Sequence, residues 1–538
     1  MTTRSSNRRE FLRLLGGAAL VGATPTWLRA AENLSPDVVT ISILHTTDLH
    51  GHILPTTDYQ GRLDLGGFAR CVTQIRRWRA ENPNSLLLDI GDVYQGTAFA
   101  LRDQGRLMVE LFNLLQYDAW LVGNHEFDWG IEPFLHALDR SDMPVLAANT
   151  VLEGKPAGDY ADAQHPFAKI QPFIVRQVAG IKIAIVGLTT PGMPYWFPPK
   201  FTEGMAFQNP VEPARRAIAH AKSLGADAIV LAGHMGLKER TGGDDFANQA
   251  IALTAEFPEL AVFIAGHTHQ DIPSRLTNGV IFTQADHFGI HVGRVDLLFD
   301  RASKKLLHQE ARCELMDSRV PLDPVIMNRA RPQLDLATAA LAQSIGRLTE
   351  NLSAKAPPGE PSQIEELIAA AVTEALAQRG LTIDGVFHGL FEEHAFKKGP
   401  KTVSDIWTIL PYENYLVTAE LTRDELRPAL EEVWQSHERR SLVGFAVSLA
   451  GKGSDLRLTS LCLRDGRPLD PSKRYRIALN TFDASSGGHR FMKLREILGR
   501  PEARSIIQPV QTRDALIEYF LRHQMVGRIG LSSQKAAA

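Results

Sequence analysis

The sequence predicts an α/β protein with two domains, and three observations carry this prediction. At 538 residues and 59.4 kDa, the chain is longer than one hydrophobic core usually accommodates. Between about Val38 and Asp300, short apolar runs alternate with helical stretches such as 66–79 and 213–224. Six of the apolar runs end in a turn, as the strands of an α/β sheet do.

Polar residues follow these six runs. The runs and the residues after them are 41–45 with Asp48 and His50, 86–88 with Asp92, 119–122 with Asn124 and His125, 183–186 with no obvious ligand, 228–231 with His234, and 262–264 with His267 and His269. Because the carboxyl ends of strands in α/β folds line one crevice, we expect these side chains to converge. Asp, Asn and His are ligands for divalent metals, and there are more here than one ion needs. The pattern predicts a two-metal hydrolase.

The local spacing supports that prediction. Asp48 and His50 alternate just past a strand, so both side chains can point toward one ion. Asp92 follows Gly91 and can bridge two cations through its two carboxylate oxygens. His125 and Asp128 are three residues apart, which places them on one face of an opening helical turn.

Composition excludes other classes. The net charge of -3 gives no indication of a surface for a nucleic-acid polymer, which would require clustered Lys and Arg. The three cysteines Cys71, Cys313 and Cys462 lie far apart, which argues against a disulfide framework or a zinc–cysteine site.

The N-terminus predicts export. Arg8 and Arg9 precede Phe-Leu and then an uncharged stretch, 14–28, which is too short for a comfortable membrane span. This pattern is typical of a twin-arginine signal over residues 1–31, and a chance Arg pair on an amphipathic helix is the alternative. We therefore expect a periplasmic or otherwise exported protein that uses the twin-arginine machinery and has no stable association with the membrane.

A change in composition separates two domains. The first would span 36–320 and be followed by a helical linker at 321–362, whose Ala-Pro-Pro-Gly-Glu-Pro run at 356–361 is the hinge candidate. The second would span 363–525, with a short polar tail over 526–538. Helices are expected at 364–378 and at 422–436, the latter with Thr422 and Glu425 as a capping box, and a strand is expected at 475–479.

The motifs resemble those of a known family. The runs that carry the resemblance are Leu-His-Thr-Thr-Asp-Leu-His-Gly-His at 44–52, Gly-Asp at 91–92, Gly-Asn-His-Glu-Phe-Asp at 123–128, Gly-His at 233–234 and Gly-His-Thr-His at 266–269. Together they are similar to the calcineurin-like metallophosphoesterases, more closely to the bacterial periplasmic 5′-nucleotidase and UDP-sugar hydrolase branch. The resemblance extends from about Val38 to Phe520. It implies a four-layer α/β/β/α sandwich followed by a smaller α/β domain of the 5′-nucleotidase C-terminal type.

The resemblance also implies roles for individual residues. The first metal would take Asp48, His50, Asp92 and His269, and the second Asp92, Asn124, His234 and His267, while His125 and Asp128 would form the dyad that stabilises the transition state. The ions would be Mn, Zn, Co or Mg, and a metal-bound hydroxide would attack a small phosphoester, with a nucleotide as the expected substrate.

The second domain matches the family with departures. Residues 408–414 resemble a Leu-Pro-Phe-x-Asn run, and Phe445 and Phe482 lie in stretches that resemble those bearing two rings around a base, although core packing is an equal alternative for Phe445. The stretch 384–391 lacks the expected Arg. His489 and Arg490 replace a ribose-binding acid and add donors suited to an oxyanion.

These departures leave the substrate open. Alternatives on the same scaffold are a 2′,3′-cyclic nucleotide, a UDP-sugar, or a thiosulfate conjugate on a carrier protein. A non-enzymatic binding protein is less favoured because the full set of catalytic residue types is present.

Overall fold

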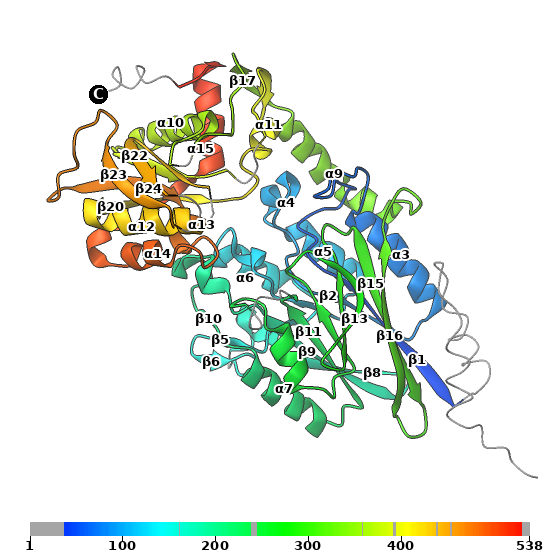
Figure 1. Cartoon of the computed structure of the whole chain (residues 1–538). Helices are drawn as coiled ribbons and strands as arrows, with labels where there is room; N and C mark the ends of the chain where they lie inside the picture. Colours follow the sequence, from blue (N-terminus) through cyan, green and yellow to red (C-terminus); the bar gives the residue numbers. More distant parts are fainter. Residues whose placement is uncertain are drawn as a thin grey trace, which may run out of the picture. The chain divides into compact units, whose positions relative to one another are not determined.

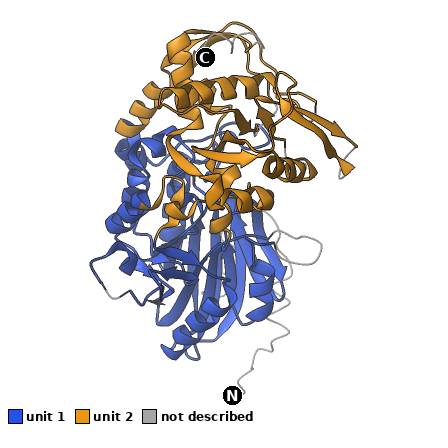
Figure 2. Cartoon of the chain, turned by 90° about the vertical axis from the view of Figure 1, so that its left-hand side faces the viewer, with its two compact units in different colours: residues 1–126, 132–191, 204–331 blue, residues 127–131, 192–203, 332–538 orange. Residues whose placement is uncertain are grey.

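The structure, a computed structural model, describes residues 37–160, 162–237, 245–357, 359–390, 394–436, 439–451 and 455–529. The predicted export signal at 1–31 and the end of the tail, from 530, lie outside this range. Two compact units emerge from the contacts: residues 1–126, 132–191 and 204–331 form the first, and residues 127–131, 192–203 and 332–538 the second (Figure 2). None of the helices within the described ranges has the length and apolar character needed to cross a membrane.

The first unit contains two large sheets. The first has the order β16-β15-β1-β2-β3-β4-β7, and its strands β1 to β7 in this order run parallel. Its members are β1 (Val38–Thr46), β2 (Ser85–Asp89), β3 (Ala119–Leu121), β4 (Val145–Leu146), β7 (Ile170–Gln171), β15 (His291–Asp300) and β16 (Leu306–Leu315). The predicted closing strand near 291–299 is β15, which returns to the first sheet and pairs antiparallel with β1.

The second sheet has the order β13-β14-β12-β11-β9-β8, with parallel strands in the middle and antiparallel strands at the edges. Its members are β8 (Phe173–Val178), β9 (Ile181–Thr189), β11 (Ala228–His234), β12 (Val262–Ala265), β13 (Asp271–Thr277) and β14 (Val280–Ala285). A third, small sheet of this unit contains β5 (Thr150–Leu152), β6 (Lys155–Pro156) and β10 (Met205–Phe207).

The two sheets pack face to face. Alternate residues of β1, such as Ile41 and Ile43, share one core with Ile183, Ile185 and Val230 of the second sheet, and all five are fully buried. Burial of each such side chain contributes about 1.5–3 kcal/mol to folding. This inter-sheet core explains why the strand ends of both sheets meet at one edge.

Helices cover the outer faces of both sheets, which confirms the four-layer sandwich (Figure 1). The helix α3 (Phe68–Glu81) buries Phe68, Cys71, Val72 and Ile75, a spacing that places them on one face. On the second sheet, α7 (Val211–Ser223) and α8 (Ala250–Glu256) pack in the same way. The other α-helices among the described residues of this unit are α4 (Ala98–Asp103), α5 (Arg106–Leu115) and α6 (Ile131–Arg140).

The second unit is a smaller α/β assembly. Its central sheet has the order β21-β18-β24-β20-β25, and its strands are β18 (Gly385–His388), β20 (Tyr415–Thr422), β21 (Ser441–Val443), β24 (Arg474–Asn480) and β25 (Ile506–Gln511). Two further sheets contain β17 (Ser344–Leu348), β19 (Gly399–Thr402) and β26 (Met525–Val526), and the hairpin β22 (Phe445–Ala450) with β23 (Arg457–Leu463). The helices are α10 (Gln363–Ala377), α11 (Val403–Trp407), α12 (Arg423–Gln435), α13 (Thr481–Ser485), α14 (Met492–Leu498) and α15 (Thr512–His523).

Local sequence signals account for several of these boundaries. The predicted capping box of Thr422 and Glu425 is present at α12, and Ser362 with Glu365 forms a second one at α10. The helix α9 (Pro324–Leu341) runs across the division between the units, which falls at residues 331 and 332 and coincides with Pro332 inside the helix.

Candidate active site

The predicted ligands come from both sheets of the first unit. The strands β1, β2 and β3 of the first sheet and β11 and β12 of the second each lead into a turn with one or more of them. The remaining strand end, that of β9, leads into Thr189 and Thr190 and has none. The convergence therefore depends on the packing of two sheets, with ligands at three strand ends of the first and two of the second, rather than on one sheet alone.

The first cluster consists of Asp48, His50, Asp92 and His269, whose ligand atoms all lie within 4.8 Å of one another. The Nε2 atom of His269 is 3.0 Å from Nε2 of His50 and 3.4 Å from Oδ1 of Asp48. Asp48 and Asp92 are almost completely buried, at 0% and 1% exposure. Two carboxylates and two imidazoles at these separations suit a divalent cation.

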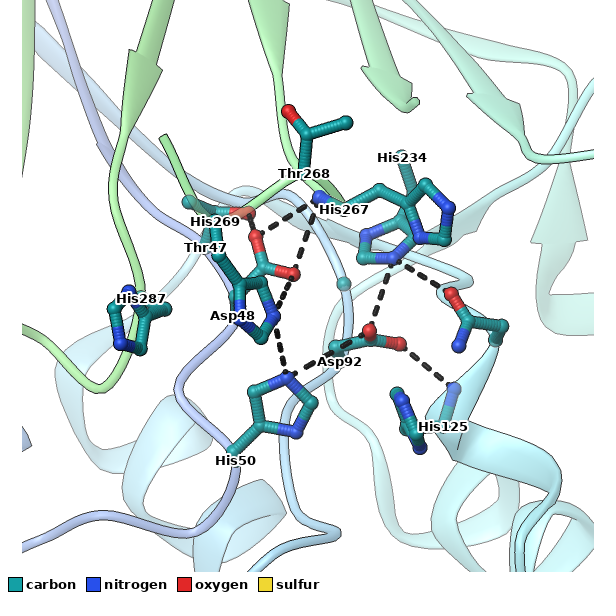
Figure 3. Close-up of polar contacts among 12 residues, drawn as sticks. Thr47, Asp48, His50, Asp92, His125, His234, His267, Thr268, His269 and His287 are labelled. Carbon is teal, nitrogen blue, oxygen red and sulfur yellow. Dashed lines mark hydrogen bonds and ion pairs between the residues drawn. The ribbon is translucent and has the colours of Figure 1, made fainter. Parts of the chain in front are cut away.

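The second cluster shares Asp92 with the first. Asp92, His234 and His267 lie within the same 4.8 Å limit, and Oδ2 of Asp92 is 3.1 Å from Nε2 of His234. The amide oxygen Oδ1 of Asn124 lies 3.2 Å from the same nitrogen. Figure 3 shows Asp92 between His50 and His234, which is the position of a bridging carboxylate.

Backbone carbonyls orient two of the imidazoles. Nδ1 of His50 donates to the carbonyl oxygen of Gln95 at 2.8 Å, and Nδ1 of His234 donates to that of Ile90 at 2.7 Å. Since a carbonyl oxygen only accepts, the proton of each neutral ring resides on Nδ1. The Nε2 lone pairs then face the cluster, which is the arrangement that metal-binding histidines require.

Electrostatics in the cluster favour a bound cation. Burial by itself raises the pKa of Asp92, but His234, His125 and His50 hold it well below its usual range. The pKa of Asp48 is about 2, because His269 and His234 outweigh its burial. Burial opposes the charged form of His234, yet Asp92 raises its pKa to about 9. The protonated His234 ring thus supplies positive charge beside ionised carboxylates, in the place that a divalent cation would take, so the donor set fits a pair of divalent metals.

The backbone is strained at the same residues. Five of the seven predicted ligands adopt positive φ angles: Asp48 at 49°, His50 at 47°, Asp92 at 56°, His267 at 77° and His269 at 52°. Such a conformation costs a non-glycine residue about 1–3 kcal/mol and persists where the surrounding structure enforces it, typically at functional sites. The sequence contains no signal for these angles apart from the neighbouring glycines.

Glu126 is a residue whose role the sequence analysis did not assign. Its carboxylate accepts hydrogen bonds from the backbone amides of Gly123, Asp92 and Val93 at 2.7, 3.1 and 2.8 Å. Burial raises its pKa to about 7, with Asp92 adding to the shift. Glu126 therefore connects the turn after β2 to the turn after β3. In the sequence, its position within the Gly-Asn-His-Glu run is the feature that could have indicated this role.

His125 lies beside the cluster in a short 3₁₀ turn, His125–Phe127. Its backbone amide donates to Oδ1 of Asp92 at 2.7 Å, and its ring centroid lies 5.0 Å from that of His50, edge to face. Asp128 follows this turn and is 8% exposed. The dyad role of these two residues stays a prediction.

In the second unit, the predicted substrate residues lie in different environments. Phe445 is 5% exposed, belongs to the hydrophobic core and packs edge to face on Tyr475, so its base-stacking role stays a prediction beside its evident packing role. Phe482 is half-buried in α13, while His489 and Arg490 are exposed in the turn that follows. Tyr412, in the 408–414 run, is 43% exposed.

The segment that lacks the expected Arg has one beside it in space. A Cβ on Gly389 would lie 2.5 Å from Cδ of Arg440, so the arginine side chain crosses this glycine. Nε of Arg440 donates to both carboxylate oxygens of Asp483 at 3.1 Å. Sequence reasoning did not find this neighbour because residue 440 follows the 384–391 segment by some fifty positions.

Comparison with known proteins accounts for both parts of the chain. Residues 41–271 match the calcineurin-like phosphoesterase family, and residues 344–496 match the 5′-nucleotidase C-terminal domain. The chain therefore contains a calcineurin-like phosphoesterase domain followed by a 5′-nucleotidase C-terminal domain. The cluster around Asp92, within the residues that match the phosphoesterase family, is a binuclear type of ligand set.

Individual relatives agree with the assignment. The chain is 25% identical over 517 residues to Endonuclease YhcR of Bacillus subtilis (strain 168), covering 89% of this chain and 40% of that protein. It is 27% identical over 496 residues to the snake venom 5′-nucleotidase of Naja atra, covering 84% and 91%. A putative 5′-nucleotidase from Staphylococcus aureus shares the fold with a TM-score of 0.74 at 21% identity, covering 89% and 96%. The chain spans less than half the length of several curated relatives, including Endonuclease YhcR.

Proposed function

We propose that this metallophosphoesterase is an exported enzyme that hydrolyses the phosphate esters of nucleotides. The observation that carries the proposal is the position of Asp92, whose carboxylate belongs to two overlapping ligand clusters. One carboxylate shared between two sets of His and Asp is an arrangement that would hold two cations as a pair.

The chain's own residues would divide the work. Two divalent cations, when bound, supply charge that neutralises phosphoryl oxygens and lowers the pKa of water. Asp48, Asp92 and Asn124 would hold the ions with oxygen ligands, and His50, His234, His267 and His269 would complete the sets. His125, held near Asp92 by its own backbone amide, would donate to the leaving oxygen, with Asp128 keeping its imidazole oriented.

The substrate class rests on the second unit. Several relatives are named 5′-nucleotidase, which supports a nucleotide as the substrate. Because one relative is named Endonuclease YhcR, a nucleic-acid polymer is also tested as a substrate. An aromatic pair around the base is expected near α13, where Phe482 is half-buried. The exposed ring of Tyr412 suits a stacking surface better than the buried ring of Phe445. A cyclic nucleotide, a UDP-sugar or a thiosulfate conjugate remains the alternative on the same scaffold.

Purified protein reconstituted with Mn, Zn, Co or Mg tests the activity. We expect release of phosphate from AMP in preference to cleavage of UDP-glucose, 2′,3′-cyclic AMP or DNA. The variant His125→Ala should keep its metal because the backbone amide of residue 125, which donates to Asp92, survives the substitution. Its turnover should fall by about 10²–10⁴-fold, the usual contribution of a proton donor. The exposed His136→Ala on α6 is the matched control. Phosphate release by His125→Ala at the wild-type rate would refute the dyad.

Export by the twin-arginine route is part of the proposal. It rests on Arg8 and Arg9 in the sequence. Replacing both with Lys should leave active precursor in the cytoplasm, measured by cell fractionation. Normal export of this variant would show that the ordinary secretory route handles the chain.

A further inference from the structure

Three of the predicted metal-ligating imidazoles have described Nδ1 partners, and they are not held in the same way. His50 and His234 donate to backbone carbonyls, whereas Nδ1 of His269 lies 2.8 Å from the hydroxyl of Tyr59. The side chain of His269 is also the most exposed of the three, at 23% against 5% and 0%. The orientation of this ligand therefore depends on side chains, which substitution can remove.

A second ring supports His269 from the side. The ring of His287 stacks on that of His269 with centroids 4.8 Å apart and planes 7° from parallel (Figure 3). Tyr59 stacks on His287 in turn, at 4.3 Å and 12°. Three nearly parallel rings thus form one cluster, and rotation of the His269 ring would disrupt its contacts with both of the others.

The supporting rings are themselves anchored. Nδ1 of His287 lies 2.5 Å from Oδ1 of Asp286, whose other oxygen is 3.0 Å from Nδ1 of His291. Tyr59 sits in a turn organised by Asp58, whose carboxylate accepts from the backbone amides of Gln60 and Arg62 at 3.0 and 2.8 Å. Asp58 is 6% exposed although Tyr59 is 63% exposed, so a buried carboxylate fixes an otherwise exposed ring.

We propose that Tyr59 and His287 are positioning residues for the first metal, acting through His269. The Tyr59 hydroxyl would accept the Nδ1 proton of His269, which leaves the Nε2 lone pair for the cation, and the His287 ring would set the angle of the imidazole. His50 and His234 need no such support because backbone carbonyls orient them. The proposal rests on the metal pair of the proposed function but not on any substrate.

Metal affinity, measured directly, tests this proposal. Wild type, Tyr59→Phe and His287→Leu would be stripped with a chelator and titrated with Mn²⁺ against a competing indicator, with bound metal counted by mass spectrometry. Tyr59→Phe keeps the stacked ring and removes only the hydroxyl. Loss of an outer hydrogen-bond partner typically weakens a metal site by about 10–100-fold. We expect that loss at one of the two sites, with the other unchanged.

A matched control separates this effect from a general loss of a hydroxyl. Tyr160→Phe removes a tyrosine hydroxyl that donates to Glu153 in the same unit, away from the clusters, and should bind both ions as wild type does. Wild-type affinities in both Tyr59→Phe and His287→Leu would overturn the proposal, as would equal weakening at both sites. If wild type binds two ions but cleaves no nucleotide, the proposed function fails while this proposal stands.

Discussion

Buried charged groups are arranged differently in the two units of the chain. In the first unit, the carboxylates and imidazoles of the two ligand clusters face one another around Asp92, while a separate buried pair, Arg294 with Asp296 at 2.9 Å, lies outside the clusters. In the second unit, each of two buried arginines faces its own carboxylate: Arg513 with Glu413 at 2.8 Å and Arg440 with Asp483 at 3.1 Å.

This difference distinguishes a candidate metal site from a buried ion pair with a structural role. The second-unit pairs supply their own countercharge, and Arg513 also donates to the carbonyl of Leu410 and stacks over Trp407 at 3.5 Å. In the first-unit clusters, imidazoles supply the countercharge, and a divalent cation bound to their Nε2 atoms would take over that role. Buried charge by itself therefore does not identify function; the balance of charge within the cluster does.

The largest effect is expected from Asp92→Ala, which removes the carboxylate common to both clusters. Both ions should be lost and hydrolysis should fall by more than about 10³-fold, since every other ligand set is then incomplete. Metal counting by mass spectrometry and phosphate release measure these losses. Asp118→Asn, a carboxylate that accepts from the Leu87 amide elsewhere on the same sheet, is the control. Retention of two ions by Asp92→Ala would show that Asp92 is not the carboxylate that the two metal sites share.

Breaking a pair in the second unit should give the opposite pattern. Glu413→Gln leaves the buried Arg513 without its carboxylate and should destabilise that unit by about 3–5 kcal/mol. Differential scanning calorimetry and hydrogen exchange would measure the loss, while the metal content of the first unit stays at two ions. The exposed pair of Arg467 and Asp465 provides a control, because Asp465→Asn should leave the melting temperature unchanged. Loss of metal in Glu413→Gln would contradict the separation of roles.

A buried group of the first unit outside the clusters predicts a pH effect. His45 is 0% exposed, and neither of its ring nitrogens has a hydrogen-bond partner among the described residues. Burial lowers its pKa to about 3. The ring fits only because residue 293 is glycine, since a Cβ there would lie 1.9 Å from Nε2.

The sign of this effect follows from the lowered pKa. The unfolded chain binds a proton at His45 below about pH 6.5 while the folded chain does not, so stability is complete above that pH and falls as pH falls toward 3. The loss should reach roughly 3 kcal/mol by pH 4. Urea unfolding at several pH values would measure this. The free energy of unfolding of His45→Phe should fall less steeply with decreasing pH than that of wild type, whereas that of the control His136→Gln, a substitution at an exposed residue, should fall as steeply as that of wild type. Identical slopes for His45→Phe and wild type would show that His45 is not the origin.

The smallest effect is expected at the surface of the second unit. Arg490 is exposed and its guanidinium donates to the carbonyl of Gly487 at 3.0 Å. If it meets an added anionic group of the substrate, Arg490→Ala should lower kcat/KM for UDP-glucose and 2′,3′-cyclic AMP by roughly two- to fivefold, and for AMP less. Arg467→Ala, exposed in the same unit, is the control. Unchanged kcat/KM for all three substrates would make Arg490 a structural residue.

Most of the elements and the chemical groups of the site can be predicted from local sequence patterns. Local signals are short-range, so an apolar run that ends in Gly-Asp or Gly-His, or a Thr followed three residues later by Glu, predicts its own turn or helix start wherever it lies. The strand ends before Asp48, Asp92 and His267, and the capping box at Thr422, were predicted for this reason.

Only the tertiary structure decided which groups meet. Two sheets, not one, bring the ligands together, because an inter-sheet core aligns three ligand-bearing strand ends of the first sheet with two of the second. Packing also buried Phe445 and left Tyr412 exposed, and it placed Tyr59 against His269, 210 positions along the chain. Such neighbours leave no trace in local periodicity, since side-chain burial and long-range contacts are set by how whole layers pack and not by the residues on either side.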